Sequence, residues 1–223
     1  MLTLNEMPQP IDDALLERLE RVDTATVGHF QYGIFMCPEL RPVITSAKAV
    51  GTAVTLRLPG TDSTLLHYAM GLVRPKDFVV IDRCGDHVNA CWGGFMAAAA
   101  REAGVAGVVV DGAVTDPAEL RESGVPVWSR SISPVTTRIG GTTGELNVAI
   151  VCGGASVSPG DAIVADESGL MVLGPDIAAE IAEQAIAMQE EERQLLESLR
   201  SGQRAPDITG ASEMIRAALD SQR

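Results

Sequence analysis

Two segments of the chain hold most of the residues that could do chemistry. The first contains residues 82–86 and 92–96, and the second contains residues 111–116. Each follows an apolar run, Phe78 to Ile81 and Val105 to Val110, that is typical of a buried strand. Ligands in parallel α/β sheets bind outside the carboxyl ends of neighbouring strands. We therefore expect the two segments to face one crevice.

The glycine pair Gly93-Gly94 stands before an alanine-rich stretch that predicts a helix. Glycines let the backbone approach a ligand closely, and the free N–H groups of Phe95 and Met96 at a helix start favour an anion such as a carboxylate. The alternative interpretation is that the glycines only allow the helix to pack on the sheet.

Asp116 is the candidate ligand for a hard cation, because Mg²⁺ typically takes one or two carboxylates and keeps several waters. Pro117 follows it directly. An Asp-Pro pair at the N-cap and first position is also favoured for structural reasons alone. On sequence alone the capping role is the favoured one. The two roles can coexist only if one carboxylate oxygen caps the helix and the other binds the metal.

Other catalytic motifs are missing from the sequence. His29, His67 and His87 have no HxH or HExxH spacing, so a conventional zinc site is not expected. There is no G-x-S-x-G elbow and no P-loop, which disfavours serine hydrolases and NTPases. Cys84 and Cys91 flank the first segment, but no histidine is an obvious partner for either, and buried reduced thiols are the expected state.

Composition narrows the class of partner. The 223 residues carry a formal charge of −13 and are 46% hydrophobic. Nucleic acid and membrane surfaces would be repelled over most of such a protein. No N-terminal leader and no run of about 18 apolar residues occurs, so a cytoplasmic protein with a small-molecule substrate is expected. A carboxylate substrate would need local positive potential from a helix start or a metal ion.

The elements that must position these residues alternate along the middle of the chain. Strands are predicted at 47–58, 78–81 and 105–110 and from 125 onwards, with helices at 64–72, 89–103 and 117–123 between them. This alternation predicts parallel strands joined by crossover helices. Glycine-rich β segments follow at 146–152, 162–165 and 170–173, and helices are expected at 12–21 and 176–199.

The segment from Val80 to Pro134 resembles the RraA-like family, which includes the class II 4-hydroxy-4-methyl-2-oxoglutarate/4-carboxy-4-hydroxy-2-oxoadipate aldolases. The matching residues are Trp92-Gly93, Ala98 to Ala100, Gly104 to Val114, Asp116, Leu120 and Pro126, with Val164 to Asp166 and Gly169 further on. The resemblance implies a single α/β domain of the swivelling β/β/α type over residues 1–223. Its core would cover about 20–200, with flanking terminal helices and a tail at 201–223. It also implies a homotrimer or homohexamer with sites between subunits.

The same resemblance implies a lyase that acts on 2-oxo acids. Such enzymes use a divalent metal, Mg²⁺ or Mn²⁺, to cleave a C–C bond and release pyruvate, often with decarboxylation of oxaloacetate. Asp116 would hold the metal, and the helix start from Gly93 to Met96, together with Thr115, would bind the substrate. Glu192 from the long helix of a neighbouring subunit would complete the site.

Two positions depart from the aldolase pattern. The aldolases carry an aspartate, twenty intervening residues and then an Arg-Asp pair, where this chain has Gly94 and Thr115-Asp116. Loss of one such electrostatic group commonly costs about 10²–10³ in rate. Arg83, Asp86 and His87 are close enough in sequence to compensate. The departures leave two further hypotheses open: an oxo-acid enzyme of altered reaction (decarboxylase, tautomerase or hydratase type), and a non-catalytic binding protein like the ribonuclease regulators of the family.

Overall fold

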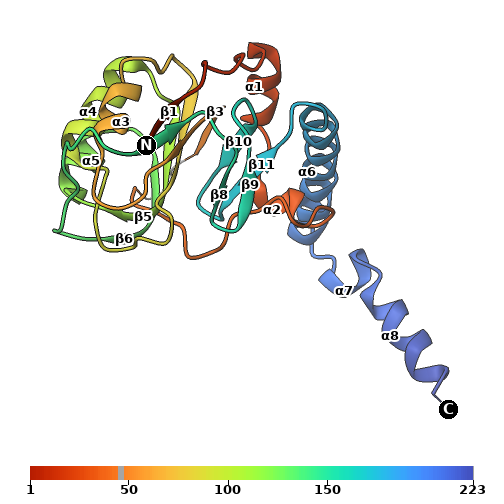
Figure 1. Ribbon diagram of the computed structural model, residues 1–223. Helices are drawn as coiled ribbons and strands as arrows, with labels where there is room; N and C mark the ends of the chain where they lie inside the picture. The colour runs from red at the N-terminus through yellow and green to blue at the C-terminus, as the bar shows by residue number, and fades with distance from the viewer. Residues whose placement is uncertain (45–47, 223) are drawn as a thin grey trace. The chain divides into compact units, whose positions relative to one another are not determined.

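The computed structural model describes residues 1–44 and 48–222 and confirms the α/β fold. Four parallel strands lie side by side in the order β3 (Ala49–Arg57), β4 (Asp77–Asp82), β5 (Gly107–Val114) and β6 (Val127–Ile132). The helices α3 (Thr64–Ala69), α4 (Gly94–Ala103) and α5 (Pro117–Ser123) connect them. Figure 1 shows these three helices together on one face of the sheet. Residue 47, the first of the strand predicted at 47–58, lies outside the described residues.

Shorter strands extend the sheet and add a second β layer. The strands β1 (Leu2–Leu4), β7 (Gly144–Leu146) and β2 (Arg41–Pro42) join at the two edges. The strand β10 (Ala162–Ala165) pairs antiparallel with both β3 and β11 (Leu170–Leu173). A hairpin of β8 (Ile150–Cys152) and β9 (Ala155–Val157) completes this part. The β segment predicted at 146–152 divides between the end of β7 and β8, and β9 was not predicted.

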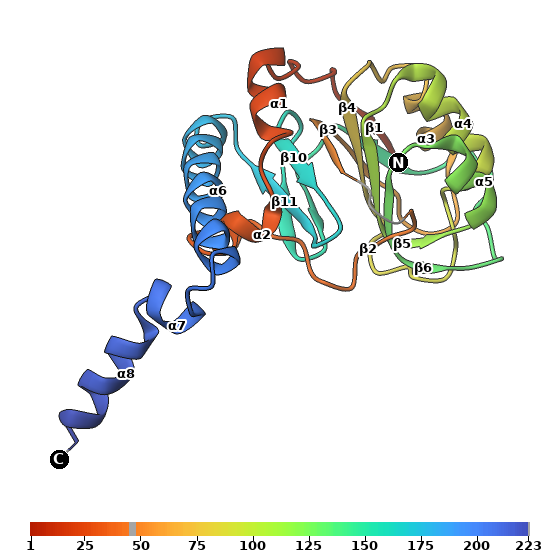
Figure 2. The same cartoon turned by 180° about the vertical axis from the view of Figure 1, so that it is seen from behind.

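The central sheet buries side chains on both faces, which is why its strands are apolar runs without alternation. On the helix face, Val79, Ile81, Val108 and Val110 pack with Trp92, Met96 and Leu120 of the connections. On the opposite face, Phe78, Val80 and Val109 pack with Trp128 and with residues of β8 to β11. The β layer, the central sheet and the helix layer can be followed in the reverse view of Figure 2.

The remaining helices lie towards the ends of the chain. They are α1 (Asp13–Leu19), α2 (Thr24–Val27), α6 (Ala178–Arg200), α7 (Ala205–Ile208) and α8 (Ala211–Asp220). The chain forms two compact units, Met1–Ala182 and Glu183–Arg223. Among the described residues, no helix combines the length and the apolar character that a membrane crossing requires.

Candidate functional site

The two segments singled out from the sequence meet at the carboxyl ends of β4 and β5. These strands are parallel neighbours, with Asp82 opposite Asp111. Beyond them, Trp92 forms a bridge with Val114, and the backbone N–H of Thr115 donates a 2.8 Å hydrogen bond to the carbonyl oxygen of Trp92. The start of α4 is therefore fixed directly against the start of α5.

Asp116 occupies the N-cap position of α5 but does not cap that helix with its side chain. Its backbone is left-handed (φ 54°, ψ 52°), and no side-chain capping bond forms. One carboxylate oxygen, Oδ2, instead accepts a 3.1 Å hydrogen bond from the backbone N–H of Gly94, and Oδ1 accepts one of 3.1 Å from the Thr115 hydroxyl. The capping role favoured on sequence alone is wrong, because the left-handed backbone turns the carboxylate towards α4.

The glycine pair is required by close contacts. A Cβ atom added at Gly93 would lie 2.5 Å from Oδ2 of Asp116 and 2.7 Å from Cγ2 of Thr115. A Cβ atom added at Gly94 would collide with the carboxylate of Glu119 and lie 2.8 Å from its Cβ atom. Two carboxylates, those of Asp116 and Glu119, thus lie over this two-glycine segment, and Glu119 fills the space that a side chain at position 94 would need.

The start of α4 offers unused backbone donors. The first bond of the helix runs from the N–H of Ala97 to the carbonyl of Gly93, at 3.0 Å. Within the described residues, the N–H groups of Phe95 and Met96 have no acceptor. The side chain of Met96 is buried in the core, whereas that of Phe95 is 75% exposed. Free N–H groups at the positive end of a helix favour an anion.

A cavity of about 150 Å³ opens at this junction. It is lined by Ser63, His67, Ala90, Cys91, Gly93, Phe95, Met96, Thr115, Asp116, Thr136 and Thr137. The structure therefore brings together all the predicted site residues of both segments except Gly94, which is linked to Asp116 by its N–H. The ring of His67 stacks on that of Phe95, with centroids 6.0 Å apart and planes 24° apart.

The cysteines near this cavity are poor nucleophiles. Cys91 is buried, and desolvation raises the pKa of its thiol to about 11. Cys84 is exposed but does not line the cavity, and its pKa is also raised, first by desolvation and then by the charge of Asp82. Because the thiolate is the reactive form, neither side chain is activated at neutral pH.

The residues proposed to replace the missing aspartate and arginine have other tasks. The guanidinium of Arg83 is fully buried and donates to the carbonyls of Leu58, Gly60 and Asn89 and to the carboxylate of Asp86. Asp86 also accepts three hydrogen bonds from Val88 and Asn89 within the same loop. His87 is exposed and is not a lining residue. That hypothesis is wrong, because these groups shape the loop and do not reach the cavity.

Asp62 fixes the loop on the other side of the cavity. Its buried carboxylate accepts hydrogen bonds from the N–H and hydroxyl of Thr64, the N–H of Gly140, the N–H and hydroxyl of Thr142, and the N–H of Thr143. These bonds, that of the Thr64 hydroxyl first, hold the pKa of Asp62 well below its usual range. Asp62 thereby ties α3, which carries His67, to the segment that follows the lining residues Thr136 and Thr137.

Metal ligands are few in this structure. No group of three His, Cys, Asp or Glu side chains in the described part of the chain could hold an ion. Glu192, predicted to act across a subunit boundary, is exposed on α6 in the unit Glu183–Arg223, so its role stays a prediction. Asp116 and Glu119 form no ion pair with a cation within the described residues. Two unpaired carboxylates fit Mg²⁺ or Mn²⁺ with water completing the shell.

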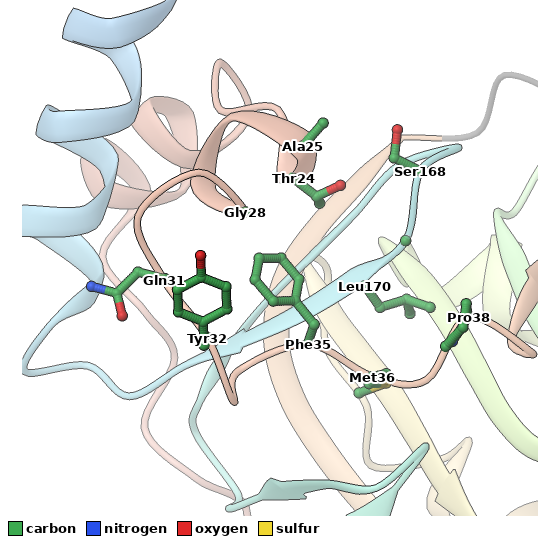
Figure 3. Close-up of a pocket in the computed structure, with 11 residues that line it drawn as sticks. Thr24, Ala25, Gly28, Gln31, Tyr32, Phe35, Met36, Pro38, Ser168 and Leu170 are labelled. Carbon is green, nitrogen blue, oxygen red and sulfur yellow. The ribbon is translucent and has the colours of Figure 1, made fainter. Parts of the chain in front are cut away.

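A larger cavity of about 290 Å³ lies elsewhere, between α2 and the end of the β10–β11 hairpin. Figure 3 shows the rings of Tyr32 and Phe35 at this cavity, with Thr24 and Ser168 above them. It has no acidic, basic or thiol side chain among its lining residues. The junction of α4 and α5 is therefore the better candidate for chemistry.

Comparison with known proteins agrees with the fold. Residues 19–172 match the RraA-like family, described as Aldolase/RraA, so the chain belongs to the RraA-like family. It is 33% identical over 172 residues to an uncharacterized protein of Methanocaldococcus jannaschii, covering 76% of this chain and 82% of that one. It is 35% identical over 127 residues to the 4-hydroxy-4-methyl-2-oxoglutarate aldolase of Thermus thermophilus, covering 57% of this chain and 76% of that enzyme.

Solved structures give the same family. The structure of Streptomyces coelicolor RraAS2, an unusual member of the RNase ES inhibitor RraA family, superposes with a TM-score of 0.73 at 28% identity over 85% of this chain and 98% of that one. The RNA-processing inhibitor RraA from Thermus thermophilis superposes with a TM-score of 0.61 at 31% identity, over 67% and 90% of the two chains. An aldolase, an RNA-processing inhibitor and an unusual member of an RNase inhibitor family are thus all similar to this chain.

Glu119 and His67 are the side chains that sequence reasoning missed. Glu119 is the third residue of α5, and a glutamate at this position commonly reaches back towards the N-cap residue, here Asp116. That position could have predicted Glu119 as part of the site. No sequence pattern predicts His67, because its position beside Phe95 depends on how α3 and α4 pack.

Proposed function

We propose that the chain is a divalent-metal-dependent lyase for 2-oxo acids that breaks a C–C bond and releases pyruvate, by retro-aldol cleavage, by decarboxylation of oxaloacetate, or by both. The observation that carries the proposal is the orientation of Asp116. Its carboxylate does not cap α5, and it lies together with the carboxylate of Glu119 over Gly93-Gly94. Like charges so placed and without a paired cation favour the binding of one.

The residues present fit Mg²⁺ or Mn²⁺. Asp116 and Glu119 would hold the ion, and Glu119 supplies the carboxylate that Gly94 lacks. When bound, such an ion would draw electron density from the 2-oxo group and so favour breaking of the bond between C3 and C4. Glu192 of a neighbouring copy, in a homotrimer or homohexamer, is proposed as a further contributor.

The substrate carboxylate would bind at the start of α4. The free N–H groups of Phe95 and Met96 supply hydrogen bonds and positive potential without a charged side chain. The hydroxyl of Thr115 already donates its hydrogen bond to Asp116, so it orients that carboxylate and does not replace the missing arginine.

His67 is proposed to move the proton. Besides Asp116 and the neutral Cys91, it is the titratable side chain among the residues that line the cavity. In retro-aldol cleavage the 4-hydroxyl group loses its proton, the bond between C3 and C4 breaks, and C3 of pyruvate gains a proton. An imidazole can accept the first proton and return it to C3. Its stacking on Phe95 holds the ring at the cavity.

The metal part of the proposal is tested by titrating the full chain with Mn²⁺ in a calorimeter. Asp116→Ala and Glu119→Ala should each weaken binding by at least tenfold, since each removes a proposed ligand. Glu122→Ala removes an exposed carboxylate from the same helix and is the matched control. Equal affinities for the parent, Asp116→Ala and Glu119→Ala would contradict the proposal.

The second candidate function is that of a non-catalytic binding protein. Thr115 in place of the expected arginine, together with the lack of any arginine or lysine among the cavity-lining residues, favours it. The similarity to RraAS2 supports the same reading. This function predicts no Mn²⁺ binding and no pyruvate release from any 2-oxo acid, so the same titration separates the two.

A further inference from the structure

A third cavity, of about 340 Å³, lies at the edge of the sheet formed by β2 and β6, next to α5. It is lined by Arg41, Pro42, Val43, Arg121, Ser129, Arg130, Ser131 and Ile132. It shares no lining residue with the cavity at Asp116. Its lining contains three arginines and two serines and no acidic side chain.

This gathering of positive charge is unusual for the chain. The sequence has 17 lysines and arginines against 30 aspartates and glutamates. Arg41 and Arg121 are exposed, and neither forms an ion pair within the part of the chain that the structure describes. Guanidinium groups that share a cavity repel each other, and a bound anion would relieve that repulsion.

Arg130 is held in place before any ligand arrives. Its Nε–H donates to Oδ1 of Asp111, and Oδ2 of Asp111 accepts a 2.7 Å hydrogen bond from the N–H of Gly153. The side chains of Arg130 and Asp111 are only 20% and 15% exposed. A guanidinium fixed in this way loses little freedom when it binds.

Besides Asp111, a second acidic side chain lies close to these arginines. The pKa of Glu39 is lowered, first by a hydrogen bond with Cys37 and in smaller part by the charges of Arg130 and Arg41. Glu39 is exposed and does not line the cavity. Even with Glu39 and Asp111 counted, the three arginines leave one excess positive charge there.

We propose that this arginine cavity binds a small anion carrying at least two negative charges, through phosphate or carboxylate groups. The planar fork of arginine matches both groups with paired hydrogen bonds. The volume lies at the lower end of the range of small-molecule sites, about 300–1,000 Å³. Arg121 stands in the last turn of α5 and Asp116 at its start, so the two cavities lie at opposite ends of one helix.

Calorimetric titration of the full chain with inorganic phosphate and, separately, with succinate tests the proposal and tells the two anion sources apart. Saturable binding of either anion is expected. Arg41→Gln and Arg121→Gln should each weaken it about tenfold, as removal of a charge-assisted hydrogen bond does. Because both side chains are exposed, these variants should keep the melting temperature of the parent.

The matched control is Arg101→Gln, which removes one exposed arginine from α4. It should leave the affinity unchanged. No saturable binding of either anion by the parent would overturn the proposal, as would an equal loss of affinity in Arg101→Gln. A change of oligomeric state in the Arg41→Gln/Arg121→Gln double variant without anion, measured by light scattering, would also overturn it, because a second copy of the chain would then occupy the cavity.

Discussion

Replacing Gly93 with alanine should disable the candidate site while leaving the fold intact. The backbone of Gly93 (φ −144°, ψ −167°) is extended and suits alanine, so the cost of the substitution is steric. The new Cβ atom would stand 2.5 Å from Oδ2 of Asp116 and 2.7 Å from Cγ2 of Thr115, and one of these groups must move. Overpacking of this kind costs about 2 kcal/mol, or roughly 4–8 °C in Tm for a chain of this length.

The same substitution should also weaken metal binding. Oδ2 is the oxygen that faces Gly94, so its displacement misplaces the proposed ligand and should weaken Mn²⁺ binding by about 10–100-fold. Calorimetry and thermal unfolding measure the two effects on one sample. Gly169→Ala is the matched control, because a Cβ atom at Gly169 meets nothing within 4 Å. Unchanged Mn²⁺ affinity in Gly93→Ala would contradict the role of Asp116 as a metal ligand.

Two further predictions concern buried groups. Asp62→Ala should lower the free energy of unfolding by about 3 kcal/mol at pH 7, because several donors to a charged acceptor lose their partner. The folded pKa of Asp62 is below its unfolded value of about 3.9, so its contribution to stability is complete above that pH and is lost as the pH falls further. Urea unfolding at pH 5 and pH 3 should therefore show that the free energy of unfolding falls less in the variant than in the parent. An equal fall in both proteins would count against the role of Asp62. Cys91 should resist alkylation by iodoacetamide at pH 8 in the folded protein, because its pKa is about 11 and its side chain is buried; rapid modification, detected by mass spectrometry, would show that the site opens.

The order of elements could be predicted from the sequence because the signals were local. Apolar runs without alternation indicated the buried strands β4 and β5. The Asp116-Pro117 pair and Gly124 set the limits of α5, which lies at Pro117–Ser123 as predicted. The helix predicted at 89–103 begins later, at Gly94, because Ala90 forms a β-bridge with Thr136. That contact is made by residues far apart in the chain, and no local pattern encodes it.

The candidate site was predicted in part for the same reason. The meeting of Gly93 with Asp116 followed from the adjacency of two parallel strands. The direction of the Asp116 carboxylate did not, because it depends on a left-handed backbone that a non-glycine residue rarely adopts. Loop residues such as Asp86 looked available in the sequence, yet their hydrogen bonds are satisfied by neighbouring backbone groups.

The central claim is most directly tested by pyruvate release. The parent and Asp116→Ala should be incubated with Mn²⁺ and a panel of 2-oxo acids that includes 4-hydroxy-4-methyl-2-oxoglutarate and oxaloacetate, with and without a chelator. We expect the parent to release pyruvate, the chelator to abolish this release, and Asp116→Ala to lower it by about 10² or more. Failure of the parent to release pyruvate from any of them, or equal release by Asp116→Ala, would contradict it.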